Sequence, residues 1–351
     1  DLGSGQSKNI TITNEKLVAG IGITKVDSSN NKVKLEGVEF IVKSSYKNGY
    51  LKIKGTGNNV KKDSSGWLTS ATGVVRIDDT KDIEKNPNIQ YVATAEEATK
   101  FITDADGIIY IDNILVKYNE TNIDYQFIET KNYNYGYTKY TNITIKDIAV
   151  GASKNVTVTN EKTVGEIGIT KVDSKDANIK LEGVEYILKS SYKNGYLKIK
   201  GTGNNVKKDS SGWLTSATGE VRIDDTKNIV TDPNIQYVAT AEEATKFITD
   251  ANGVIYISNL LVNYNGTNIE YQLMEIKNLN YGYTKLENVT MKDIAVGEKR
   301  KITVTNIKQT GDINITKVDS DDGSIKLEGV EYVVKSSYQN GYIQIKGTGD
   351  N

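Results

Sequence analysis

The hexapeptide ITKVDS occupies residues 23–28, 169–174 and 315–320, so its copies lie 146 residues apart. A longer stretch, KSSYKNGYLKIKGTGNNVKKDSSGWLTSATG at 43–73, recurs letter for letter at 189–219. Repetition at a fixed spacing is the signature of tandem modules, and it has to be recognised before local patterns are interpreted. The 351 residues therefore hold two complete units of 146 residues and a fragment at each end.

The spacing predicts how the chain is divided. We expect the last strand of a preceding repeat at 1–16, a first repeat at 17–162, a second repeat at 163–308 and the N-terminal part of a third at 309–351. On this interpretation the sequence is a window on a longer array. The absence of a basic-then-apolar leader at its start then says nothing about secretion.

Each unit shows the alternation of apolar and polar residues that is typical of half-buried β-strands. Clusters of Gly, Asn, Asp and Ser separate short segments that are rich in Val, Ile, Tyr and Thr. In the first unit these segments are GIGITKV (20–26), VEFIV (38–42), YLKIK (50–54), VVRID (74–78), IQYVA (89–93), GIIYI (107–111), DYQFIE (124–129) and NVTVTN (155–160). We therefore predict an all-β fold in which each unit is an antiparallel sandwich.

Two local signals add detail to this pattern. The segment TAEEATKF at 94–101 predicts a helix of a turn or two, because Thr94 and Glu97 are spaced as a capping box. The pair Asp106-Gly107 predicts a two-residue hairpin turn that needs positive φ.

Composition removes several classes of function. The chain has 44 Lys and Arg against 45 Asp and Glu, and it has neither Cys nor His. Without those two residue types it forms no disulfide, no thiolate or imidazole metal site, and no Cys or Ser-His catalytic pair. A formal net charge of −1 without a basic block argues against nucleic acid and anionic membranes as partners. The apolar runs are too short to span a bilayer, and we expect no metal and no cofactor.

Each unit also places polar side chains on an apolar strand face. Side chains two residues apart point to the same side of a strand, so Lys25 follows Ile21 and Ile23 toward the core. The same parity selects Lys25, Glu129 and Asn160 in the first unit, Lys171, Glu275 and Asn306 in the second, and Asn14 and Lys317 in the fragments. Each full unit thus directs one Lys, one carboxylate and one carboxamide into its interior.

Burial of these groups needs compensation, because an unpaired charge in a protein interior is costly. One interpretation is a hydrogen-bonded Lys–Glu–Asn cluster, or strand ends from which Lys25 and Glu129 reach solvent. The other is that the three groups react. Desolvation lowers a Lys pKa and raises a Glu pKa, which yields a neutral amine beside a protonated carboxyl. The amine then attacks the Asn carbonyl, ammonia leaves, and a Lys–Asn isopeptide bond forms; the residues alone leave both interpretations open.

The segments that carry these residues resemble a known family. The stretches ITKVDS…KLEGVEFIV, FITDADGIIYIDNILV, YQFIETKNYNYGY and VTVTNEK are similar to the Cna B-type (SpaA-like, prealbumin-like) repeats of Gram-positive surface adhesins and pilins. The resemblance covers both full units and, by phase, both fragments. It implies a prealbumin-like or Ig-like sandwich in each unit, elaborated here by the longer segment 44–100. After Glu129 the loop TKNYNYGY lacks the Ala-Pro of the family pattern and is one residue longer.

The resemblance also implies a chemistry. In that family a Lys of the first strand bonds an Asn or Asp of the last strand, and a Glu assists. By position the bonds are Lys25–Asn160 with Glu129, and Lys171–Asn306 with Glu275. Each bond forms once, so the resemblance implies a structural protein and not an enzyme with turnover. It further implies an extracellular location, on the cell wall or a surface appendage, with neighbouring repeats or subunits of the same filament as partners.

Other functions stay open at this stage. One alternative is a ligand-binding adhesin module in which the segment 44–100 engages a host or matrix ligand. Another is that Lys and Asn pair between chains and join subunits covalently. A third hypothesis is an exposed aromatic patch for a partner, whose rings otherwise pack the domain ends; its members are Tyr46, Tyr50, Tyr133, Tyr135 and Tyr137.

Overall fold

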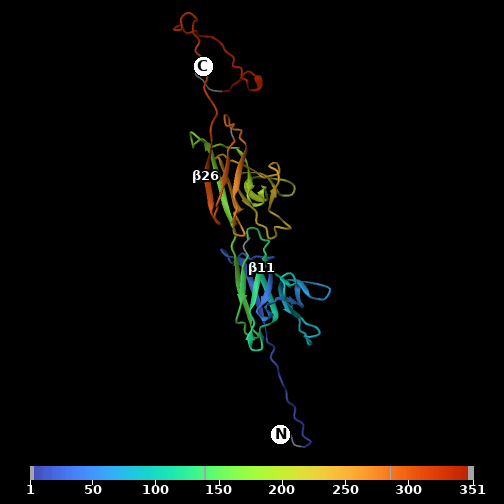
Figure 1. The fold of residues 1–351 in the computed structure, drawn as a ribbon. Coiled ribbons are helices and arrows are strands. Elements are labelled where there is room, and N and C mark those ends of the chain that lie inside the picture. Colours follow the sequence, from blue (N-terminus) through green and yellow to red (C-terminus); the bar gives the residue numbers. More distant parts are fainter. Residues whose placement is uncertain (1–3, 138–139, 285, 347–351) are drawn as a thin grey trace. The chain divides into compact units, whose positions relative to one another are not determined.

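The computed structural model describes residues 4–137, 140–284 and 286–346, and the regular secondary structure of these residues is almost entirely β-strand (Figure 1). The first repeat contains β1 (Val18–Asp27), β2 (Glu39–Ser44), β3 (Tyr50–Ile53), β4 (Gly55–Lys62), β5 (Leu68–Ile77), β6 (Ile89–Val92), β7 (Lys100–Ile102), β8 (Ile108–Leu115), β9 (Lys117–Tyr118), β10 (Thr121–Asn122), β11 (Tyr125–Lys131), β12 (Asn142–Ile145) and β13 (Ser153–Asn160). The second repeat contains β14 (Val164–Asp173), β15 (Glu185–Ser190), β16 (Tyr196–Ile199), β17 (Gly201–Lys208), β18 (Leu214–Ile223), β19 (Ile235–Val238), β20 (Lys246–Ile248), β21 (Val254–Leu261), β22 (Asn263–Tyr264), β23 (Thr267–Asn268), β24 (Tyr271–Lys277), β25 (Asn288–Met291) and β26 (Lys299–Asn306). Single 3-10 turns are η1 (Tyr46–Asn48), η2 (Tyr192–Asn194) and η3 (Tyr338–Asn340).

Each full repeat is built on one eleven-stranded sheet that folds over on itself. In the first repeat the strand order is β12-β11-β2-β7-β5-β8-β1-β13, with β3 joined to β2 and β6, and β4 joined to β5. Side chains of β1 and β11, which are not neighbours in this order, contact each other across the interior. A buried cluster that includes Ile21, Phe40, Val75 and Phe127 fills the space between the layers. The predicted all-β sandwich is confirmed.

The first and last strands of each repeat lie side by side and run parallel. β1 pairs with β13, with Lys25 opposite Val158 and Asp27 opposite Asn160. β14 pairs with β26 in the same register, with Lys171 opposite Val304 and Asp173 opposite Asn306. Lys25 and Asn160 are therefore two positions apart along one ladder, although 135 positions separate them in sequence.

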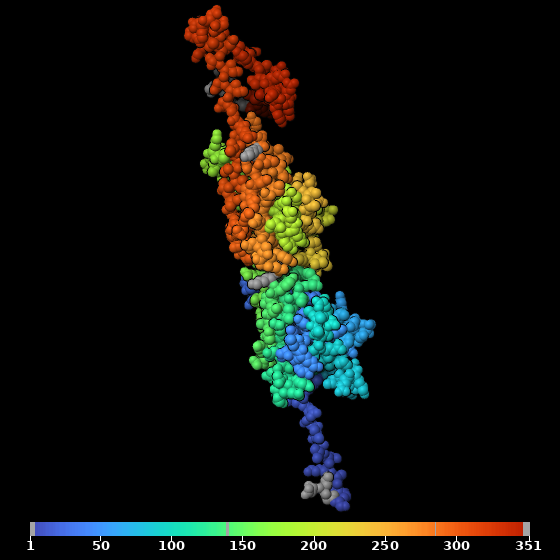
Figure 2. All heavy atoms as spheres, viewed as in Figure 1, coloured from blue at the N-terminus to red at the C-terminus, as the bar shows by residue number. Residues whose placement is uncertain are grey.

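The segment 44–100 adds strands to the sandwich, as predicted. It contributes β3, β4, β5 and β6, and in space-filling view it forms a blue-to-cyan lobe on the side of the first repeat (Figure 2). Leu51 and Ile53 of β3 are fully buried, so the lobe is anchored in the core.

Two local predictions are wrong. Residues 94–101 form no helix: Thr94 Oγ1 does donate to Glu97 Oε2 at 3.2 Å, but the Thr99 backbone N–H donates to Leu51 O at 2.9 Å and draws the chain into the sheet. The turn at Gly107 has the expected positive φ of 72°, but it is no hairpin, because β7 and β8 do not pair with each other and both pair with β5.

The chain divides by its internal contacts into Asp1–Lys308, which holds both full repeats, and Gln309–Asn351. The predicted segments 1–16 and 309–351 extend into residues 1–3 and 347–351, which lie outside the described ones. Residues 10–16, predicted as a last strand, form no strand. β13 pairs with β1, and among the described strands none pairs with residues 10–16.

Candidate functional site

Lys25, Glu129 and Asn160 meet in the interior of the first repeat, where their exposures are 0%, 4% and 2%. Lys25 Nζ donates to Asn160 Oδ1 at 2.6 Å and lies 2.8 Å from Glu129 Oε2. Asn160 Nδ2 donates to Glu129 Oε1 at 2.7 Å. The two oxygens of one carboxylate therefore contact the Lys amine and the Asn amide nitrogen at the same time.

The second repeat has the same arrangement. Lys171 Nζ donates to Asn306 Oδ1 at 2.5 Å and lies 3.0 Å from Glu275 Oε2. Asn306 Nδ2 donates to Glu275 Oε1 at 2.9 Å. Both full repeats thus bring together the three residues that strand parity selects.

A glycine fixes the strand that carries each lysine. The Lys25 backbone N–H donates to Gly107 O at 2.7 Å, and a Cβ on Gly107 would lie 2.4 Å from Lys25 O. In the second repeat, a Cβ on Gly253 would likewise lie 2.4 Å from Lys171 O. Positive φ and close approach to backbone both require glycine here, so this turn sets the position of the lysine.

Glu129 is held next to a β-bulge. It lies opposite Phe40 in the pairing of β11 with β2, and the register shifts between Glu129 and Lys131. The backbone N–H of Thr141 donates to Glu129 Oε2 at 3.0 Å. The bulge falls where the sequence begins to depart from the family pattern, and the glutamate side chain still points into the core.

Burial acts on the charge of the two lysines. Desolvation lowers the pKa of Lys25 from its usual value, although attraction to Glu129 and a hydrogen bond with it oppose the shift. Desolvation likewise lowers the pKa of Lys171, against the opposing effect of Glu275. The Phe40 ring, whose centroid lies 5.7 Å from Lys25 Nζ, is part of the apolar wall that excludes water. A lowered pKa increases the share of neutral amine, which is the nucleophilic form.

Two further side chains contact the reacting groups and were not selected by strand parity. The two repeats differ at both positions. Thr141 Oγ1 donates to Asn160 Oδ1 at 2.7 Å, whereas the second repeat has Glu287 at this position. The second repeat has Tyr186 in place of Phe40, and its hydroxyl donates to Glu275 Oε2 at 3.2 Å. Thr141 precedes β12 in a loop, where no periodicity marks a residue as pointing inward.

A tyrosine ties the loop after β11 to the first strand. Tyr137 OH donates to Asp27 Oδ2 at 2.7 Å, and Asp27 lies opposite Asn160 in the ladder. Tyr283 OH donates to Asp173 in the second repeat. The hypothesis of an exposed aromatic patch is wrong for Tyr135 and Tyr137, because Tyr137 is 7% exposed and Tyr135 is 4% exposed.

The two fragments do not build the site. Asn14 and Lys317 are exposed and belong to no strand, so neither points into a core as parity predicts. Within the described residues no group of three or more acidic, Cys or His side chains is placed to hold a metal ion.

Several solved structures are similar to this chain. The shaft pilin SpaA from Lactobacillus rhamnosus GG shares 18% identity over 85% of this chain and 100% of that chain, with a TM-score of 0.38. The chain is similar to a shaft pilin. The Bacillus anthracis TIE protein shares 19% identity over 93% of this chain and 41% of that chain, with a TM-score of 0.31. A streptococcal ancillary pilin shares 17% identity over 84% of this chain and 63% of that chain, with a TM-score of 0.34.

No family model and no curated protein matches the sequence. In the described ranges, no helix has the length and apolar character needed to cross a membrane.

Proposed function

We propose that each full repeat closes an autocatalytic isopeptide bond, Lys25–Asn160 in the first and Lys171–Asn306 in the second, and that the repeats serve as the stalk or shaft of a surface adhesin or pilus. One observation carries the chemical part. The carboxylate of Glu129 bridges the amine that attacks and the nitrogen that leaves, at 2.8 Å and 2.7 Å. A carboxylate in that place transfers a proton from one nitrogen to the other.

The reaction balances without any other reagent. Glu129 takes a proton from the Lys25 ammonium through Oε2, and the neutral amine attacks Asn160 Cγ. Negative charge grows on Asn160 Oδ1, to which Thr141 Oγ1 donates. The C–Nδ2 bond then breaks, the proton on Glu129 passes to Nδ2, and ammonia leaves. The former amine nitrogen gives its second proton back to Glu129, so the products are a secondary amide between the two side chains, neutral ammonia and a protonated Glu129 carboxyl.

The geometry supports closure within one repeat. Lys25 and Asn160 belong to neighbouring strands of the same sheet, and both are almost completely buried. An incoming chain has no access to either group while the sandwich is folded. Bonds between chains would require the core to open, so the alternative of intermolecular joining has no support in this site.

The position of the bond explains a mechanical role. It encloses residues 26–159, which is 134 of the 146 in the repeat. Tension that enters at β1 crosses from Lys25 to Asn160 and passes to the next repeat through residues 161–170. The enclosed part of the fold lies outside that path. A module of this kind suits a tether exposed to shear at the cell surface, and each bond forms once, without turnover.

Single-molecule pulling on the full chain tests this role. The unmodified protein should show no extension step from residues 26–159. The variant Glu129→Ala should release them, with an added length of about 450 Å for 134 residues. Tyr125→Phe, a substitution on the same strand that leaves the three side chains intact, should behave like the unmodified chain. An identical release in the unmodified protein and in Glu129→Ala would contradict the proposal.

A further inference from the structure

The connector 161–170 is the place where a single cut would separate the two repeats. With the proposed bonds closed, a cut inside 26–159 leaves the molecule in one piece, because the bond still joins both sides of it. Most of the connector belongs to β14, which is paired with β21 and β26, and the part outside any strand is 161–163. Proteases prefer accessible segments outside regular structure, so 161–163 is where the chain is most open to severance.

The backbone around Lys162 is held from both repeats. A basic residue makes this segment a substrate for proteases of trypsin-like specificity, but the Lys162 ammonium pairs with Asp225 of the second repeat. Thr163, which follows it, is buried. Its backbone N–H and its hydroxyl both donate to Gly136 O at 2.8 Å. On the other side, the Val262 N–H donates to Thr163 O at 3.0 Å. The peptide bond after Lys162 therefore lies between two hydrogen-bonded partners.

The loop after β11, which supplies one of these partners, is itself seated in the second repeat. Tyr135 belongs to the buried cluster of that repeat. Its hydroxyl donates to Asn259 O at 3.1 Å, and its backbone N–H donates to Thr226 O at 2.9 Å. The Ile229 N–H donates in turn to Tyr133 O at 3.0 Å. One buried ring and three hydrogen bonds thus fix the loop beside the connector.

A glycine brings the loop against the connector. Gly136 has a φ of 91°, and a Cβ there would lie 2.8 Å from Lys162 Cγ and 3.1 Å from Val164 Cγ1. Positive φ and close approach both favour glycine at this position. The base of the loop is tied to the first strand, because Tyr137 OH donates to Asp27 Oδ2. The loop therefore runs from β1 of the first repeat into the second repeat, alongside the connector.

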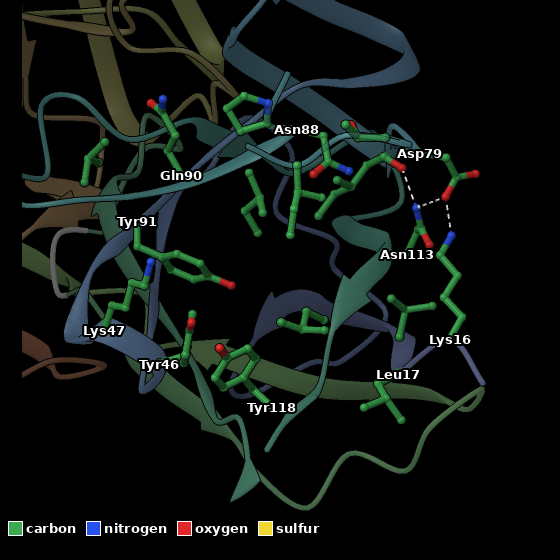
Figure 3. Close-up of a pocket in the computed structure, with 18 residues that line it drawn as sticks. Lys16, Leu17, Tyr46, Lys47, Asp79, Asn88, Gln90, Tyr91, Asn113 and Tyr118 are labelled. Carbon is green, nitrogen blue, oxygen red and sulfur yellow. Dashed lines mark hydrogen bonds and ion pairs between the residues drawn. The ribbon is translucent and has the colours of Figure 1, made fainter. Parts of the chain in front are cut away.

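The groove that receives Tyr135, here named the socket, has a counterpart in the first repeat with the same polar contact. Figure 3 shows that counterpart, in which Asp79 accepts hydrogen bonds from Lys16 and Asn113. In the second repeat Asp225 likewise accepts from Lys162. A lysine two residues before the first strand thus pairs with an aspartate of the socket in both repeats.

We propose that the loop 133–137, seated in the socket of the next repeat of the same chain, shields the connector from proteases. A protease needs an extended and accessible segment, so cleavage after Lys162 waits until Tyr135 leaves the socket and Gly136 releases Thr163. The rate of cleavage then follows the population of the open joint. The importance of this one segment for the integrity of the chain rests on the proposed bonds, whereas the shielding itself does not.

Tryptic digestion of the full chain tests the shielding. In Tyr135→Ala, cleavage after Lys162, measured by mass spectrometry as a new terminus at Thr163, should be at least about tenfold faster than in the unmodified chain. Tyr281→Ala, at the exposed counterpart of Tyr135 in the second repeat, should leave this rate unchanged. Cleavage after the exposed Lys8 should be equally fast in every chain and verifies equal protease activity.

A second variant approaches the contact from the loop backbone. Gly136→Ala places a Cβ against the connector, so cleavage after Lys162 should again accelerate. Cleavage after Lys198, on β16, should stay slow in both variants, which distinguishes an open joint from an unfolded second repeat. Unchanged cleavage after Lys162 in both variants, or equal acceleration at Lys198, would overturn the proposal.

The same digest reports on the bonds separately. A chain cut only after the exposed Lys85 should stay in one piece on denaturing electrophoresis when the Lys25–Asn160 bond is closed. Separation into two fragments would show that the bond is absent. The rate of cleavage after Lys162 is measured in either case, so failure of the proposed function and failure of the shielding are told apart.

Discussion

Thr141 contacts the reacting carboxamide of the first repeat, and its counterpart in the second repeat is Glu287. The substitution Thr141→Val removes a hydroxyl that donates to Asn160 Oδ1, where charge grows in the transition state. We expect closure of the first repeat to slow on the order of 10²-fold, the loss typical of one such donor. Mass spectrometry of chains sampled after cell-free synthesis measures the rate. Thr144→Val, at an exposed threonine on β12, is the control, and equal rates for the two variants would exclude a role for the hydroxyl.

The lowered pKa of Lys25 makes closure depend on pH. Only the neutral amine attacks, so the rate should rise with pH and level off once the amine is deprotonated. Because burial lowers this pKa, the plateau should begin below the ordinary lysine value of 10.5. The slow variant Thr141→Val allows the rate to be followed across pH values. A rate that keeps rising to pH 10.5 would show that the lysine is not shifted.

The three central residues could be predicted from the sequence, because strand parity is a local property. Ile21 and Ile23 define an inward face, and Lys25 continues it. Thr141 could not be predicted, since its contact depends on how a loop meets β13. For Tyr135 the sequence left open an exposed patch or packing at a domain end, because its ring is buried by a different repeat and nothing local indicates that.

At the scale of elements, the turn before β8 positions β1. The substitution Gly107→Ala combines a positive φ with a Cβ only 2.4 Å from Lys25 O. Gly37 also has a positive φ, but a Cβ there would lie in open space. The substitution Gly37→Ala therefore carries only the backbone strain, which lowers the free energy of unfolding by about 1–2 kcal/mol. We expect Gly107→Ala to cost clearly more than Gly37→Ala and to impair closure of the first repeat. Urea unfolding in the Glu129→Ala, Glu275→Ala background measures both costs, and equal costs would contradict this role of the turn.

The elements that sequence patterns predict well are the strands with clear alternation. The segment 94–101 was predicted as a helix because its capping signal is local, yet pairing of β7 with β2 and β5 decides its structure. The Asp106-Gly107 turn shows the same limit. The residues indicate a turn, but only the tertiary pairing determines which strands it connects.

At the scale of the whole molecule, the bond constrains the unfolded chain. The double substitution Lys25→Met, Glu129→Gln prevents closure without leaving a lone buried charge. We expect the free energy of unfolding of the first repeat to fall by about 5 kcal/mol. This is the contribution expected when a cross-link restricts the entropy of an unfolded loop of this length. Urea unfolding followed by tryptophan fluorescence, which reports Trp67 in the first repeat and Trp213 in the second, measures the change. Unaltered stability of the first repeat would show that no such loop is closed.

The most direct test of the account is the intact mass of the full chain. Two closed repeats predict a mass lower than that of the 351-residue sequence by two molecules of ammonia. Glu129→Ala and Glu275→Ala should each remove the deficit of one ammonia molecule, and the double variant should show no deficit relative to its own sequence. Fragment spectra should place the links at Lys25–Asn160 and Lys171–Asn306. A mass equal to that of the sequence in the unmodified protein would contradict the central claim.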